Sequence, residues 1–145
     1  MTPERNTEKL FRDCRFLIIE DDDGISEFLE ELFTAEEGAK EVIVCRSIEE
    51  VPIGKNSFSA VVANLYTVGQ ISSYDLRRNG TGKLSQQVER LRKTCPETPI
   101  VFIHSMKEEL IRIDAEVRAE AWIVYPFELE ELLGILVGVI KPSKN

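Results

Sequence analysis

The stretch FSAVVAN, residues 58–64, decides the fold. Its apolar centre lacks polar alternation, which is typical of a strand that is buried on both faces of a parallel sheet. Comparable runs are RFLIIEDDD from residue 15, TPIVFIHS from residue 98 and AWIVYPF from residue 121. Segments with helical periodicity lie between these runs. The alternation predicts an α/β fold in which helices cover both faces of a parallel sheet.

The periodicity places strands at residues 16–19, 41–45, 58–63 and 100–103, with a further strand in AWIVYPF. The spacing of apolar residues predicts three further helices, and Gly38 is expected to end the first of them. Ser47 and Glu50 have the spacing of a capping box for a short helix. The core-facing residues expected on the three helices are Ile25, Phe28, Leu29, Leu32 and Phe33 on the first, Leu84, Val88 and Leu91 on the second, and Leu129, Leu132, Leu133, Leu136 and Ile140 on the last, which spans about residues 128–140.

Length and composition indicate one domain, since 145 residues with 43% hydrophobic content suffice for a single core. We expect a polar segment at residues 1–14, the domain at residues 15–141 and a tail at residues 142–145. A net charge of -8 argues against a nucleic-acid partner, because the chain has no basic surplus. Neither a signal peptide nor a membrane-spanning run is present, so we expect a cytoplasmic protein without membrane contact. Three widely spaced cysteines, Cys14, Cys45 and Cys95, fit reduced thiols better than disulfides or zinc ligands.

Polar side chains end three of the strands: Glu20 and Asp21 follow the first, Asn64 ends the third, and His104 with Ser105 ends the fourth. Tyr125 and Pro126 follow the fifth strand. The carboxyl ends of parallel strands meet at one edge of the sheet, so these side chains are expected to converge there.

The order of strands and the spacing of these residues resemble the receiver domain of two-component response regulators. The resemblance covers roughly residues 15–140 and implies a doubly wound, flavodoxin-like sheet of five parallel strands in the order 2-1-3-4-5. In that family an acidic pair, here Glu20 and Asp21, holds a magnesium ion. The third strand ends in the phosphoacceptor aspartate, where this chain has Asn64.

Three reactive positions of the family have changed type. Asn64 replaces the aspartate, His104 stands where a threonine or serine is usual, and Tyr125 replaces the lysine before Pro-Phe. An amide offers no carboxylate nucleophile, so we expect no aspartyl phosphorylation at Asn64. The resemblance therefore implies a pseudo-receiver.

Two readings of the acidic corner stay open. Clustered carboxylates repel each other and usually need a hard cation, for which magnesium or calcium is the natural candidate at Glu20 and Asp21. Alternatively, Glu20, Asp21 and Asp22 end the strand and cap the next helix. Because Asn64 offers only a neutral oxygen, we expect weak or absent Mg²⁺ binding and no other cofactor.

His104, the single histidine, is either a base or ligand beside Asp21 or a packed neutral side chain. Trp122 occupies the place of the family's switch aromatic. It either packs the edge strand or anchors a partner protein on a surface that Phe127 extends. The long connection after Asn64 is expected to lie over the former active site, as a functional or a disordered loop. Its Asp75 is a weak candidate for a substitute phosphoacceptor.

Three functions follow, and no complete catalytic arrangement can be assembled from the sequence for the last of them. The first is a stand-alone, non-enzymatic signalling module that acts by protein contact, through the helix after the fourth strand, the fifth strand and the last helix. The same face could form a homodimer. The second is a sensor that binds a small molecule or divalent ion in the altered crevice. The third is an enzyme that uses His104 with Asp21.

Overall fold

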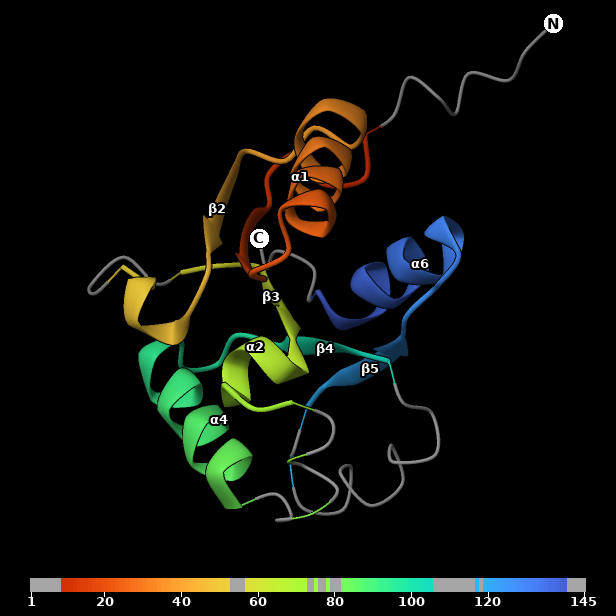
Figure 1. Cartoon of the computed structure of the whole chain (residues 1–145). Coiled ribbons are helices and arrows are strands. Elements are labelled where there is room, and N and C mark those ends of the chain that lie inside the picture. The colour runs from red at the N-terminus through yellow and green to blue at the C-terminus, as the bar shows by residue number, and fades with distance from the viewer. Residues whose placement is uncertain are drawn as a thin grey trace, which may run out of the picture.

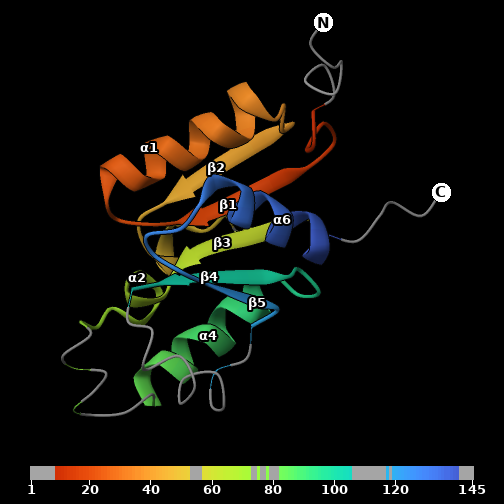
Figure 2. The same ribbon diagram turned by 90° about the vertical axis from the view of Figure 1, so that its right-hand side faces the viewer.

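The computed structural model describes residues 9–52, 57–72, 75, 78, 82–105, 117 and 119–140. Five parallel strands form one sheet in the order β2-β1-β3-β4-β5 (Figures 1 and 2). They are β1 (Arg15–Ile19), β2 (Glu41–Cys45), β3 (Ala60–Asn64), β4 (Ile100–His104) and β5 (Ala121–Val124). The predicted fold class and strand order are confirmed.

Helices cover both faces of this sheet. In Figure 2, α1 (Asp23–Glu31) and α6 (Leu129–Val139) lie on one side, and α4 (Gly82–Thr94) lies on the other. The short helix α2 (Leu65–Gly69) follows β3 directly and packs on α4. The helical segment expected after β4 falls on residues 106–116 and 118, which lie outside the described residues.

The first helix begins at a cap and ends in a wider turn. The Asp22 carboxylate accepts a hydrogen bond from the Ile25 amide at 2.9 Å, which satisfies one free N–H of the first turn. After Glu31 the helix continues as the π-helical turn η2 (Leu32–Glu36). Gly38 then reverses the chain with a φ of 73°, as its position predicted.

Two residues expected in the core are exposed. Phe28 is 49% exposed, because it lies about 100° around the helix axis from Leu29, which occupies the buried stripe. Leu129 is 38% exposed at the first turn of α6, whereas Leu132 and Leu136 are fully buried. The prediction that Phe28 and Leu129 are core residues was therefore wrong. Both lie at the edge of the apolar stripe of their helix.

The capping box predicted for the second short helix is absent. Ser47 makes no side-chain cap in front of the 3₁₀ turn η3 (Ile48–Glu50). The Glu50 carboxylate instead accepts a hydrogen bond from the Arg46 amide at 2.8 Å. Residues 53–56 lie outside the described residues.

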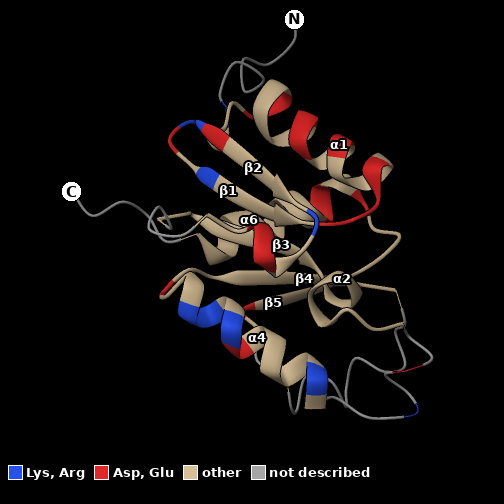
Figure 3. Cartoon of the chain, turned by 60° about the vertical axis from the view of Figure 1, so that its left-hand side comes forward, with Lys and Arg blue, Asp and Glu red and all other residues tan. Residues whose placement is uncertain are grey.

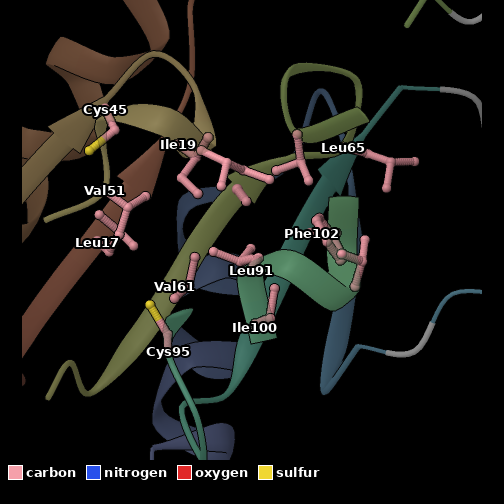
Figure 4. Close-up of a cluster of buried hydrophobic side chains, with 14 of the residues drawn as sticks. Leu17, Ile19, Cys45, Val51, Val61, Leu65, Leu91, Cys95, Ile100 and Phe102 are labelled. Atoms are coloured by element: carbon pink, nitrogen blue, oxygen red, sulfur yellow. The ribbon is translucent and has the colours of Figure 1, made fainter. Parts of the chain in front are cut away.

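The sheet separates two buried clusters. One lies beneath α2 and α4 and includes Leu17, Val61, Leu91 and Phe102 (Figure 4). The other lies beneath α1 and α6 and includes Ile18. Neighbouring β1 residues therefore point to opposite faces, as expected for a strand that is covered on both sides.

The packed unit begins earlier than the predicted boundary at Arg15. Phe11 is 1% exposed and packs edge-on against Phe16, with ring centroids 4.9 Å apart. Phe33 stacks on the same ring at 4.6 Å. Composition alone hid this contact, since Phe11 is a single aromatic residue within a polar segment.

In the part of the chain that the structure describes, no helix combines the length and apolar character needed to cross a membrane.

Candidate functional site

The polar residues at the strand ends lie at one edge of the sheet. Glu20 follows β1, Asn64 ends β3 and His104 ends β4. In the parallel register Ile19 is paired with Ala63, and Asn64 is paired with Ile103, so these ends are level. Tyr125 follows β5, and its amide donates to the His104 carbonyl at 2.7 Å.

Asn64 uses both ends of its amide. Its Nδ2 donates to Glu20 Oε1 at 3.0 Å and to Oε2 at 3.2 Å. Its Oδ1 accepts hydrogen bonds from the amides of Tyr66 at 2.9 Å and Thr67 at 3.4 Å, which caps α2. An aspartate could keep the cap, but it could not donate to Glu20. This site therefore requires a group that both donates and accepts.

Glu20 is a buried acid. Only 1% of the residue is exposed, and its Oε2 also accepts a hydrogen bond from the Asp22 amide at 3.0 Å. Burial raises the pKa of Glu20 above its ordinary value, because a carboxylate loses its hydration inside the protein. The hydrogen bond from Asn64 opposes this rise by stabilising the charged form.

The neighbouring acids also have protein donors. The Thr67 hydroxyl donates to Asp21 Oδ1 at 3.0 Å. Arg46 forms an ion pair with Asp23, and its Nη2 donates to the Asp21 carbonyl at 2.9 Å. The acidic corner is thus partly compensated by a guanidinium, a hydroxyl and an amide that belong to the chain itself.

Sequence reasoning missed Arg46 and Thr67. Arg46 directly follows β2, and β2 lies beside β1 in the sheet, so the predicted strand order already placed it near the acids. Thr67 gave no such signal, because the helix that carries it was not predicted. Only the start of α2 immediately after Asn64 brings this hydroxyl to Asp21.

The oxygens of Glu20 and Asp21 already have hydrogen-bond donors within the chain. Among the described residues no group of three or more His, Cys, Asp or Glu side chains is placed to hold a metal ion. Glu20 oxygens face Asn64, and one Asp21 oxygen faces Thr67. A magnesium ion at Glu20 and Asp21 would compete with these donors for the carboxylate oxygens.

Two cavities flank Asn64. A polar one of about 480 Å³ is lined by Asp21, Arg46, Asn64 and Asp75, among others. Residues 70–72 line it as well, so this part of the long connection borders the same cavity as Asn64. Asp75, which lies further along the chain in the long connection, lines the same cavity as Asn64.

The second cavity, of about 160 Å³, is lined by His104, Ser105 and Tyr125 together with Asn64 and Tyr66. Asp21 borders the first cavity and His104 the second. His104 is 1% exposed, and its ring lies edge-on to Tyr66 and Trp122, with centroids 6.3 and 6.1 Å away. This packing matches the structural reading of His104 better than a role as base beside Asp21.

The two aromatic residues assigned to one partner surface lie on opposite faces of the sheet. Trp122 packs against the cluster beneath α2 and α4, with its ring 5.3 Å from that of Phe102. Phe127 packs against the cluster beneath α1 and α6. Strand alternation and the turn at Pro126 separate them, so Phe127 does not extend the surface of Trp122.

The cysteines are free, as predicted. Cys45 and Cys95 are buried, and Cys14 is half-buried. Burial raises the pKa of all three thiols, and that of Cys45 reaches about 11.

Comparisons with known proteins agree on the fold. No family model matches the chain, and no curated protein matches it. Among solved structures, the non-phosphorylated HemR receiver domain from Leptospira biflexa is 26% identical, covers 92% of this chain and 98% of its own, and has a TM-score of 0.63.

A signal receiver domain of a two-component histidine kinase from Clostridium thermocellum has a TM-score of 0.68 at 12% identity, covering 90% of this chain and 99% of its own. A CheY-like response regulator from Mesorhizobium loti has a TM-score of 0.63 at 14% identity, covering 88% and 98%. The structural neighbours are consistently receiver domains, and this chain has their fold.

Proposed function

We propose that the protein is a signalling module of the response-regulator receiver type that acts by protein contact and does not depend on aspartyl phosphorylation. One observation carries the proposal: the Asn64 amide donates to both carboxylate oxygens of Glu20. The position that accepts the phosphoryl group in the resembling family is here a structural link between β1 and β3.

Phosphoryl transfer needs a nucleophile, a cation and a positive partner for the developing charge. Asn64 offers no carboxylate, and its nitrogen is committed to Glu20. Tyr125 supplies a hydroxyl but no positive charge. Arg46, the nearby cation, is held by Asp23. Two of these parts, the nucleophile and the positive partner, are thus missing or engaged elsewhere.

The compensated corner also gives the module a reason to be independent of metal. Receiver-like acidic pockets rely on a cation to offset repulsion. Here the guanidinium of Arg46 and the donors of Asn64 and Thr67 offset part of it. We expect one stable arrangement of this edge, with signalling output through binding to another protein.

The surface for that output was predicted on the helix after β4, on β5 and on α6, where a homodimer is the alternative. Of this face the structure describes β5 and α6. Val137 of α6 is 51% exposed, which leaves an apolar side chain available there.

The test is incubation with acetyl phosphate and Mg²⁺, followed by intact-mass measurement under neutral conditions. We expect no phosphoryl adduct on the natural protein. The Asn64→Asp variant is the comparison, because it supplies a carboxylate at the acceptor position, although it also removes the donor to Glu20. A labile adduct on the natural protein would overturn the proposal, and Asp75→Asn would then show whether that residue is the acceptor.

A second function, ligand sensing, is favoured by the cavity of about 480 Å³ beside Asn64. Its lining mixes carboxylates, hydroxyls and Arg46, which suits a small polar ligand more than an apolar one. A ligand that binds the native state would raise the melting temperature. Thermal denaturation against divalent ions and polar metabolites tests this function, and Thr67→Val, which removes a lining hydroxyl, should weaken any response.

A further inference from the structure

The ends of β3, β4 and β5 surround a small cavity that lies next to the polar cavity of about 480 Å³. It encloses about 160 Å³, and two isoleucines and three rings form most of its wall: Ile25, Ile103, Tyr66, His104 and Tyr125. An apolar protein cavity of about 150 Å³ is large enough to hold one benzene molecule. The volume therefore fits a ligand that is built on a single ring.

Among the described residues that line this small cavity there is no Asp, Glu, Lys or Arg. In Figure 3, α2 and β4, which both contribute to the lining, are tan, whereas the acidic side chains gather on α1. The polar cavity differs, since Asp21, Arg46 and Asp75 line it. An anion such as phosphate needs charged or strongly donating partners when it leaves water. A neutral ligand therefore suits the small cavity better than an anion.

Packing and hydrogen bonds hold the walls of the small cavity in place. The ring of His104 lies edge-on to that of Tyr66 at 6.3 Å, and the ring of Tyr125 lies edge-on to that of Phe127 at 5.8 Å. The amide of Asn64 is already hydrogen-bonded at both ends. Such a wall loses little side-chain entropy when a ligand binds, and its rings present edges and faces to another ring.

The exposed part of the lining carries hydroxyl groups. Ser105 and Tyr125 are the exposed lining residues, and each hydroxyl can both donate and accept a hydrogen bond. Ile103 and His104, in contrast, are buried and form the inner end. A ligand would therefore place its ring against the inner wall and its polar group toward the two hydroxyls.

We propose that this cavity binds a small neutral molecule with one aromatic ring and one hydroxyl group, of which phenol is the simplest example. Ring contacts with Tyr66, His104 and Tyr125 provide affinity, because edge-to-face aromatic pairs are favourable beyond the area that they bury. The hydroxyls of Ser105 and Tyr125 fix the orientation of the polar group. This binding site goes beyond the function by protein contact and does not rest on it.

The chain contains its own reporter of this site. Trp122 is the single tryptophan, and its ring lies edge-on to that of His104 at 6.1 Å. Phenol is titrated into the whole protein while the fluorescence of Trp122 is followed, and we expect a saturable change. Thermal denaturation gives a second signal, because a ligand of the native state raises the melting temperature. Cyclohexanol, which has the hydroxyl without the aromatic ring, and inorganic phosphate should both bind more weakly than phenol.

A variant that fills the cavity locates the site. Ser105→Phe places a ring at the exposed edge and should weaken phenol binding about tenfold or more, since phenol loses its buried apolar contact. Ser72→Phe is the matched control, because Ser72 is also exposed but lines the polar cavity and not the small one. Circular dichroism checks that each variant is folded; if Ser105→Phe is not, Ser105→Leu gives the same comparison.

Three results would overturn the proposal. A fluorescence change that stays linear in phenol, without a shift in melting temperature, would show collision with Trp122 and not a binding site. Equal binding by Ser105→Phe and the natural protein would place the site elsewhere. Binding of cyclohexanol or phosphate as tight as that of phenol would assign another class of ligand. None of these results bears on the acetyl phosphate experiment, so failure of this site is distinguishable from failure of the phosphorylation-independent function.

Discussion

Replacing Asn64 by aspartate should make the protein dependent on a divalent cation. Aspartate keeps an oxygen for the α2 cap but removes the donor to Glu20. It places a second carboxylate where an amide nitrogen now lies 3.0 and 3.2 Å from the Glu20 oxygens. Two unit charges about 4 Å apart repel by about 4 kcal/mol at an effective dielectric constant near 20.

Protonation of one partner limits the observed loss. Holding a carboxyl of ordinary pKa protonated at pH 7 costs about 3.7 kcal/mol, a similar amount. We therefore expect Asn64→Asp to lower the free energy of unfolding by about 2–4 kcal/mol in EDTA at neutral pH, with a melting temperature about 5–15 °C lower. Magnesium at about a hundred times its dissociation constant should recover about 2.7 kcal/mol.

The assay is chemical and thermal denaturation in EDTA and in MgCl₂, at about pH 5 and pH 7. The paired carboxyls have raised pKa values in the fold, so the variant's deficit should shrink as pH falls. Asn64→Ala is the control: it also loses the donor and the cap, but it should show no magnesium rescue. The reasoning is refuted if Asn64→Asp matches the natural protein in EDTA at pH 7, or if magnesium stabilises both proteins equally.

Three further outcomes are expected. Burial raises the pKa of Glu20, so its protonated form stabilises the fold below the ordinary pKa of 4.5, and this stabilisation is lost as pH rises through the folded pKa. The Glu20→Gln variant does not titrate at this position. Denaturation curves should therefore show its stability relative to the natural protein increasing over that pH range and then levelling off. Thr67→Val should lower the free energy of unfolding by about 1 kcal/mol in urea denaturation, because Asp21 loses a hydrogen bond. Under native conditions iodoacetamide should alkylate Cys14 before Cys45, since Cys45 is buried with a pKa raised to about 11; mass mapping of the labelled peptides checks the order.

The candidate site was predictable in part. The polar ends of the strands lie at one edge because parallel strands share a direction, and that requires only the apolar runs and their order. The donors at this edge were not predictable in the same way. Asn64 and Glu20 are 44 residues apart, and Thr67 and Asp21 are 46 apart. Local patterns do not encode hydrogen bonds over such separations.

The exposure of Phe28 and Leu129 shows the same division. Periodicity assigned Phe28 and Leu129 to the core, because both lie at the edge of an apolar stripe. Whether a marginal position is covered depends on how two helices pack, and α1 and α6 leave these two residues uncovered. Phe11 is the opposite case, because it lies in a segment predicted to be polar and yet its ring packs against Phe16, which in turn stacks on Phe33.

By itself, the sequence determined the class of fold and the identity of the residues at the strand ends, because hydrophobic periodicity is a local property. The order of the strands was implied by the resemblance to receiver domains. Only the tertiary structure decided that Asn64 donates to Glu20, that Arg46 lies at the acidic corner and that Phe28 faces outward. These outcomes depend on distances between elements that are remote in the chain, which are set when the whole sheet and its helices pack together.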